Sequence, residues 1–108
     1  MVIILLLSRF RDMLYIRIFI GGTIMPVLSR FYGIVIKMYF QQAEHNPPHI
    51  HAIYGDDTAS IDIQTGDILE GYLPPKALSM VQEWIGINQK SLLKMWKTQE
   101  FKTLSPLE

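Results

Sequence analysis

The sequence has no cysteine among its 108 residues, and this absence narrows the possible chemistry. Disulfide frameworks, thiolate zinc sites and cysteine nucleophiles are all excluded, and nothing in the chain requires an oxidising compartment. An excess of positive charge is also lacking, because ten basic and ten acidic residues cancel. A neutral chain is a poor candidate for holding nucleic acid by bulk electrostatic attraction. We therefore expect a cytoplasmic protein for which nucleic acid is not the favoured partner.

Uninterrupted hydrophobic runs long enough to cross a membrane are lacking too. A spanning helix needs roughly 20 mostly apolar residues, and the apolar stretch at residues 1–24 is broken by Arg9, Arg11, Asp12 and Arg17. A secretion signal would place its positive charges before the apolar run rather than after it. Neither a membrane span nor a signal peptide fits this stretch, and we expect no membrane partner.

Residues 1–24 are better explained as a non-native extension that lies upstream of a start at Met25. Met25-Pro26 is a plausible beginning, and the codons of Gly21-Gly22 can form a bacterial ribosome-binding sequence shortly before it. The alternative is a genuine extra strand or helix. Under the first interpretation, residues 25–101 form a single domain and residues 102–108 form a loose tail. Residues 25–108 then hold seven basic and nine acidic residues, a net charge of −2.

Four segments after Met25 have the composition of β-strands and are separated by turn residues. They cover residues 33–40, 49–54, 58–63 and 67–71, with Gly55-Asp56-Asp57 and Thr65-Gly66 as turns. Successive side chains of a strand point to opposite faces, so one face of each segment should be apolar. The expected core face carries Ile34, Ile36, Met38, Phe40, Ile50, Ala52, Tyr54, Ile61 and Ile63.

A helical pattern follows Leu73-Pro74-Pro75, since proline is tolerated in the first turn of a helix. Gly86 and Asn88 interrupt the pattern and leave open one long helix or two. The apolar stripe comprises Leu78, Val81, Ile85, Leu92 and Trp96, flanked by Ala77, Met80 and Trp84. The sequence therefore predicts an α+β domain: a small antiparallel meander of three or four strands, with a C-terminal helix or helix pair packed on one face.

The most distinctive motif is His45-Asn46-Pro47-Pro48-His49-Ile50-His51, which contains all three histidines of the chain. Two consecutive prolines stiffen its centre, because each fixes φ and the residue before each is held extended. His49 and His51 should project from one face of the following strand. Both possible registers of the next hairpin place Asp62 beside a histidine, opposite His51 in one and opposite His49 in the other.

Three explanations of this motif remain open. His45, His49 and His51 could bind zinc or another divalent metal, with Asp62 or Glu44 as an additional partner. His49, His51 and Asp62 could instead act in metal-free acid–base catalysis, as in ribonucleases. The third explanation is that the histidines only satisfy local hydrogen bonds. Residues that could bind a ligand around the motif are Arg30, Lys37, Tyr39, Asn46, Pro47, Pro48 and Ser60.

Several stretches together resemble a known family, the bacterial domain of unknown function 4160 (DUF4160). The similar stretches are residues 25–34, Met38-Tyr39-Phe40, the histidine motif with Ala52, Tyr54-Gly55, Leu69-Glu70-Gly71 and residues 73–78. The resemblance runs from Met25 to about Trp96 and excludes residues 1–24. It implies a small bacterial gene without an established activity, often placed beside a second small gene as in toxin–antitoxin modules.

Two functional hypotheses follow from the motif and the resemblance. The first is a binding module that acts with a small partner protein encoded nearby. The second is a small metal-dependent or histidine-based hydrolase or ribonuclease that uses His45, His49, His51 and Asp62. Under the first hypothesis, the polar face of the sheet or the helix would form the interface.

Overall fold

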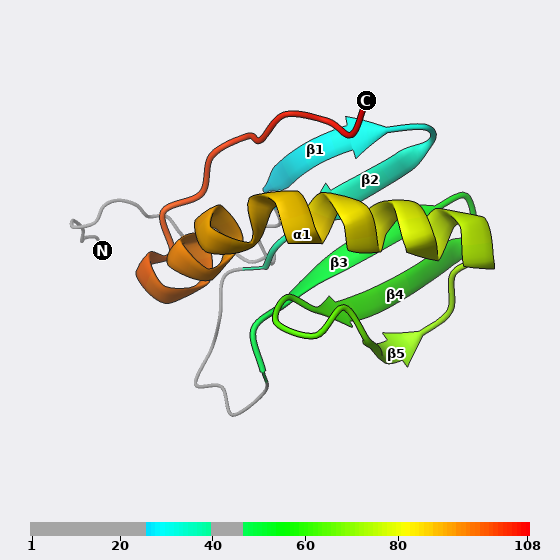
Figure 1. Ribbon diagram of the computed structural model, residues 1–108, viewed down its shortest axis with the longest axis horizontal. Helices are drawn as coiled ribbons and strands as arrows, with labels where there is room; N and C mark the ends of the chain where they lie inside the picture. The colour runs from blue at the N-terminus through cyan, green and yellow to red at the C-terminus, as the bar shows by residue number, and fades with distance from the viewer. Residues whose placement is uncertain (1–25, 40–46) are drawn as a thin grey trace, which may run out of the picture.

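The computed structural model describes residues 26–39 and 47–108. In these ranges the chain forms one five-stranded antiparallel sheet in the order β1-β2-β3-β4-β5, followed by a single helix. The helix α1 runs across one face of the sheet, and the other face is turned away from it (Figure 1). The elements are β1 (Val27–Phe31), β2 (Ile34–Lys37), β3 (His49–Tyr54), β4 (Asp57–Asp62), β5 (Ile68–Gly71) and α1 (Pro75–Thr98).

The predicted α+β class and the antiparallel meander with a C-terminal helix are confirmed, but the sheet has one strand more than expected. That strand is β1, which the sequence does not reveal for two reasons. A bulge lies between Val27 and Ser29, so Leu28 and Ser29 are both buried and the alternation of faces is lost. The turn after β1 also has an unusual composition, because its first residue is a tyrosine.

The turn between β1 and β2 consists of Tyr32 and Gly33, both with positive φ, at 50° and 80°. Two positive φ values define the type I′ turn, whose twist matches that of the flanking strands. A bulky aromatic residue is rare at such a position, where asparagine, aspartate or glycine is usual. Phe31 and Ile34 therefore pair directly across a tight hairpin.

The hairpin between β3 and β4 settles the register that the sequence left open. Its loop residues are Gly55 and Asp56, and Tyr54 pairs with Asp57. Consequently His51 lies opposite Ser60, and His49 lies opposite Asp62. The prediction that Asp62 lies beside a histidine is confirmed at the level of strand pairing.

The hydrophobic core lies between the sheet and α1, as the alternation of β2, β3 and β4 predicts. Tyr54 is a correction to the expected core, since 39% of its surface is exposed. It is the last residue of β3, at the end of the sheet where side chains border an open groove rather than the core. The core residues in the strands, or directly after them, are Leu28, Phe31, Ile34, Ile36, Met38, Ile50, Ala52, Ala59, Ile61 and Ile63.

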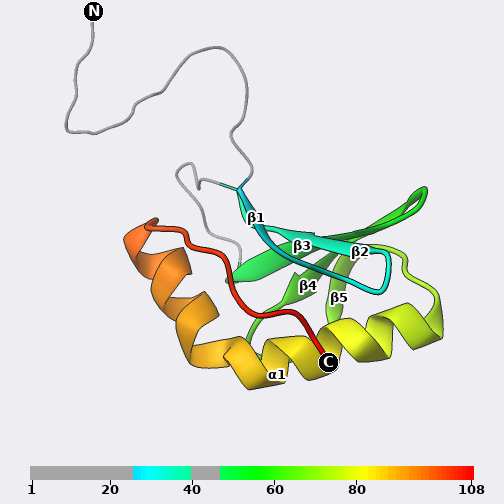
Figure 2. The ribbon, with the colours of Figure 1, turned by 90° about the horizontal axis from the view of Figure 1, so that it is seen from above.

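The helix is continuous from Pro75 to Thr98, which decides between the one-helix and two-helix alternatives. Its axis changes direction along its length (Figure 2). The side-chain amide of Asn88 donates to the carbonyl of Trp84 at 2.9 Å, and such competition with the backbone ladder bends helices. The buried helix residues are Ala77, Val81, Trp84, Ile85, Leu92 and Met95. The expected stripe is thus largely confirmed, with Leu78 and Trp96 only partly buried.

Residues 102–108 differ from the loose tail that we expected. The N–H of Leu104 donates to the carbonyl of Leu28 at 2.7 Å, and the indole N–H of Trp84 donates to the carbonyl of Ser105 at 2.8 Å. Leu104 and Leu107 also pack against the core. The segment therefore runs back along β1 and α1 (Figure 1), because the buried indole needs an acceptor and the edge of β1 offers a free carbonyl.

Several expectations fall outside the described residues: the extension at residues 1–24, the start at Met25, and the positions of Phe40, Glu44, His45 and Asn46. Within residues 26–39 and 47–108, no helix is long and apolar enough to cross a membrane.

Candidate functional site on the outward face of the sheet

The outward face of the sheet, opposite α1, carries the second set of side chains from β2, β3 and β4. Because Ile50 and Ala52 face the core, His49 and His51 point the other way. Lys37 pairs with His51 from one side, and Ser60 pairs with it from the other. The sequence-based prediction that these residues share a face away from the core is therefore confirmed by the strand register.

Aromatic rings on this face form a continuous stack. The rings of Tyr39 and His51 lie nearly parallel, at 15°, with centroids 3.9 Å apart. The rings of His51 and His49 meet edge to face, with centroids 5.0 Å apart. The ring of His49 in turn lies 4.9 Å from that of Trp96, near the end of α1. We call Tyr39, His51, His49 and Trp96 the ring stack.

His51 is the most constrained member of the ring stack. Its Nδ1 atom lies 3.3 Å from the hydroxyl oxygen of Ser60, and its Nε2 atom is buried without a hydrogen-bond partner among the described residues. Burial, and secondarily the neighbouring His49, lowers the pKa of His51 to about 4. The ring is therefore uncharged at neutral pH, which makes it a weak proton acceptor but a good surface for stacking.

His49 is held by the proline segment that precedes it. Its Nδ1–H donates to the carbonyl of Pro47 at 2.9 Å, so this tautomer leaves Nε2 as the acceptor or ligand atom. The carbonyl of Pro48 accepts the N–H of Ile63 at 2.9 Å, which fixes the segment to the end of β4. The rigid Pro-Pro pair thus sets the orientation of the His49 ring.

The carboxylate of Asp62 is bound to the backbone of the turn that follows β4, and its predicted acid–base role stays a prediction. Asp62 is 7% exposed, and its Oδ1 atom accepts the backbone N–H groups of Gln64 and Thr65 at 2.6 and 3.0 Å. These two bonds close the turn between β4 and β5 in the manner of an aspartate turn. Although Asp62 pairs with His49 in the strand register, its carboxylate stabilises the backbone of this turn.

The predicted metal site is only partly placed by the structure. Within residues 26–39 and 47–108, no group of three or more His, Asp or Glu side chains converges as metal ligands do. His49 and His51 are neighbours, but the third predicted ligand, His45, lies outside these ranges. The proposed zinc or other divalent metal therefore stays a prediction.

A hollow of about 380 Å³ lies beside the ring stack, toward β5. Pro47, His49 and Ser60 line one part of it, and Leu69 and Glu70 line the other. Leu69 is 44% exposed because a bulge between Ser60 and Ile61 in the pairing with β5 adds an unpaired residue there. Pro47, His49 and Ser60 are among the predicted site residues, whereas Leu69, Glu70 and Trp96 were missed.

Other predicted ligand-binding residues lie around this centre. Lys37 is half-buried directly beside His51. Arg30 is exposed on β1 and pairs with Val35. It therefore lies on the outward face, but it is not in line with Lys37, His51 and Ser60 across the strands. Asn46 lies outside the described residues.

The fold and this face define a class of small α+β domain, in which a five-stranded meander buries one face under a helix and presents a histidine-bearing face. The family comparison then assigns the chain: residues 33–97 match the family described as a domain of unknown function (DUF4160), and the protein belongs to it. The resemblance seen in the sequence is thereby confirmed. Comparisons with curated proteins and with solved structures found no match.

Proposed function

We propose that this DUF4160 protein is a binding module that holds a small partner protein on the outward face of its sheet. The observation that carries the proposal is the ring stack beside the hollow lined by Leu69 and Glu70. Aromatic residues are enriched in the centres of protein interfaces, because they bury much area with little loss of conformational entropy. The ring stack is held rigid by Pro47 and Ser60, so little order is lost on binding.

The electrostatics of the face favour a protein partner over a nucleic acid. His51 is neutral at physiological pH, and Glu70 adds a negative charge to the hollow. Phosphate recognition would need several positive groups here. Lys37 is one such group, but its neighbour His51 is uncharged at neutral pH. An apolar side chain of a partner protein would match the exposed Leu69 in this hollow.

The partner that we propose is a small protein encoded beside this gene, in an arrangement like a toxin–antitoxin pair. The experiment is co-expression of the chain with the product of the adjacent small gene, followed by size-exclusion chromatography. We expect the two proteins to elute together. Leu69→Glu, which places a charge in the hollow at an exposed position, should separate them.

The matched control for Leu69→Glu is a substitution on α1, away from the hollow. Ile87 on α1 is 69% exposed and lies outside the hollow, so Ile87→Glu makes the same chemical change elsewhere. It should leave co-elution intact. Equal behaviour of the two variants, or separate elution of the unmodified proteins, would contradict the proposal.

The second candidate function is a small hydrolase or ribonuclease. The observation that favours it is the contact between the Ser60 hydroxyl and Nδ1 of His51 at 3.3 Å, which resembles a nucleophile and its base. Against it, the low pKa of His51 weakens the base, and the Asp62 carboxylate is bound to backbone N–H groups. Purified protein incubated with RNA and esters, with and without added Zn²⁺, tests it. Turnover that Ser60→Ala or His51→Ala abolishes would establish this second function instead.

A further inference from the structure

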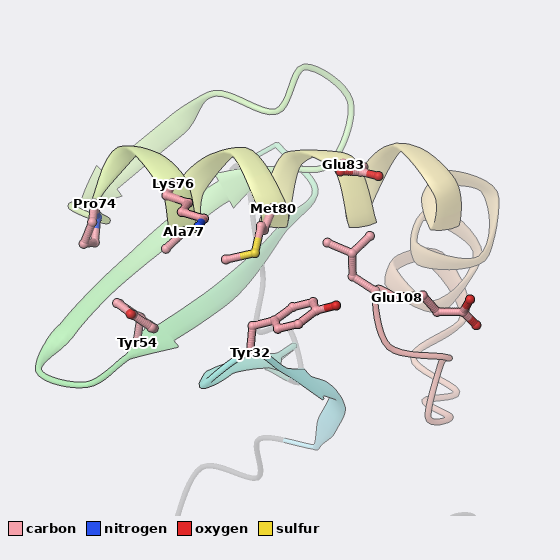
Figure 3. Close-up of a pocket in the computed structure, with 9 residues that line it drawn as sticks. Tyr32, Tyr54, Pro74, Lys76, Ala77, Met80, Glu83 and Glu108 are labelled. Atoms are coloured by element: carbon pink, nitrogen blue, oxygen red, sulfur yellow. The ribbon is translucent and has the colours of Figure 1, made fainter.

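A second concave surface lies on the helix side of the sheet, away from the ring stack. It is a groove of about 490 Å³ between the start of α1 and the turns of the two hairpins. Tyr32 and Tyr54 form one wall, and Ala77 and Met80 of α1 form the other (Figure 3). Its volume is within the range of sites that bind small ligands or single side chains. We call it the tyrosine groove.

Both tyrosine side chains that line the tyrosine groove are exposed, Tyr32 at 60% and Tyr54 at 39%. Tyr32 has a φ of 50°, a conformation that costs a residue with a side chain roughly 1–2 kcal/mol. Asparagine or glycine would form the same turn without that cost. Strained residues of this kind cluster at binding and catalytic sites.

Gly33 allows the second ring to sit beside the first. A Cβ atom added at Gly33 would lie 3.4 Å from Cε1 of Tyr54, so the Tyr54 ring rests on this glycine. The φ of Gly33 is 80° as well, which a residue with a side chain rarely adopts. The turn Tyr32-Gly33 therefore positions both aromatic walls of the tyrosine groove.

The charges of the tyrosine groove are unequal at its two ends. Lys76 lies at the end next to Pro74, and Glu83 and the side chain of Glu108 lie at the other. Figure 3 shows the ring of Tyr32 directed toward this acidic end, with Met80 between the two tyrosines. Tyrosine faces attract cations. A guanidinium group can stack on an aromatic ring and also form paired hydrogen bonds with a carboxylate, and the tyrosine groove is lined by both kinds of group.

We propose that the tyrosine groove binds an arginine side chain of a protein segment. The guanidinium stacks on Tyr32 and faces Glu83, while the aliphatic stem lies against Met80 and Tyr54. Charge complementarity and the exposed tyrosine faces select arginine over a neutral side chain of the same shape. The tyrosine groove is on the other side of the sheet from the ring stack. Arginine binding here can therefore be tested independently of the partner protein proposed above.

The test uses two blocked tripeptides, acetyl-Gly-Arg-Gly-amide and acetyl-Gly-citrulline-Gly-amide, titrated into the ¹⁵N-labelled full chain and followed by NMR. Citrulline has the shape of arginine without its charge. We expect the arginine peptide to shift the amide signals of Gly33 and Met80 and to bind at least about fivefold more tightly than the citrulline peptide. Equal binding of the two peptides, or shifts confined to other residues, would overturn the proposal.

Variants separate binding from folding. Tyr32→Asn introduces a residue that the turn prefers, so the melting temperature should stay the same or rise while affinity for the arginine peptide falls about fivefold or more. Tyr32→Phe should retain binding, because the aromatic face is kept. Glu83→Gln should weaken binding of the arginine peptide alone. Tyr72 is similarly exposed, at 58%, and lies outside the tyrosine groove, so Tyr72→Asn is the control. Full binding by Tyr32→Asn would refute the site.

Discussion

The ring of Tyr39 lies almost flat on the ring of His51, with their centroids 3.9 Å apart. Tyr39 follows β2 and His51 is the third residue of β3, so this contact joins neighbouring strands on the face opposite the helix. It covers one side of a histidine that is already partly buried. The packing of the sheet therefore keeps His51 uncharged at neutral pH. Because of this, we expect the stability of the protein to depend on pH.

Acidification should destabilise the protein through His51. Folding lowers its pKa from 6.5 to about 4, so the unfolded chain binds more protons between these two values. Stability is therefore full above pH 6.5 and is lost as the pH falls toward 4. The ring is only partly buried, so solvent screening reduces the effect to roughly 1–2 kcal/mol.

Urea unfolding at pH 7.0, 5.5 and 4.5 measures this dependence. His51→Gln should flatten the curve over that interval, because the titrating group is removed. A histidine signal that titrates by NMR near pH 6.5 for His51, or an unchanged slope in His51→Gln, would show that the ring is not desolvated as the structure indicates.

Asp62 should contribute to stability through the turn between β4 and β5. Asp62→Ala leaves the N–H groups of Gln64 and Thr65 without their acceptor, and we expect a loss of about 1–3 kcal/mol in the free energy of unfolding. Asp62→Asn retains an acceptor oxygen and should lose less. Chemical denaturation measures both losses.

The unmodified protein is the reference for both variants. If Asp62→Ala is as stable as the unmodified protein, the turn between β4 and β5 does not depend on these two hydrogen bonds.

Gly71 should tolerate no side chain. A Cβ atom there would lie 2.2 Å from the carbonyl oxygen of Thr58, and its φ is 90°. Gly71→Ala must displace β5 from β4, so we expect a loss of more than about 2 kcal/mol in thermal or urea unfolding. The bulge beside the hollow would be lost with it.

Gly86 offers the matched control within α1. A Cβ atom added there meets nothing within 4 Å, and alanine is the better helix former by about 0.8–1.0 kcal/mol. Gly86→Ala should therefore stabilise the protein. If Gly71→Ala were as stable as the unmodified protein, the close approach of Gly71 to the carbonyl of Thr58 would be contradicted.

The amino-acid pattern predicts those parts of the fold in which local periodicity and tertiary packing agree. Residues 49–54 alternate cleanly, and β3 has the predicted bounds with Ile50 and Ala52 in the core. The strand β1 escaped prediction because its bulge and its Tyr32-Gly33 turn break the usual signals. Residue preferences predict typical turns, whereas this turn holds Tyr32 at a positive φ that the surrounding structure must maintain.

The sequence predicts those parts of the candidate site that lie within one strand or in the hairpin next to it. The motif places His49 and His51 on a common face, and the hairpin limits Asp62 to two positions. Trp96 of α1 contacts His49, which is about 45 residues away in the sequence. No local sequence pattern predicts that contact. The hollow likewise depends on a bulge in β5. The two hydrogen bonds from the N–H groups of Gln64 and Thr65 to Asp62 depend on the geometry of the turn, which the sequence pattern does not specify.

We propose above that the outward face, with the ring stack and the hollow, binds the small partner protein. The most direct test is isothermal titration calorimetry of the purified chain with the product of the neighbouring gene, for the unmodified protein, Leu69→Glu and Ile87→Glu. A buried charge at a central contact costs several kcal/mol, so Leu69→Glu should weaken affinity at least about 100-fold. Ile87→Glu should change it less than about threefold. Equal affinities for all three proteins, or selective loss in Ile87→Glu, would contradict the account.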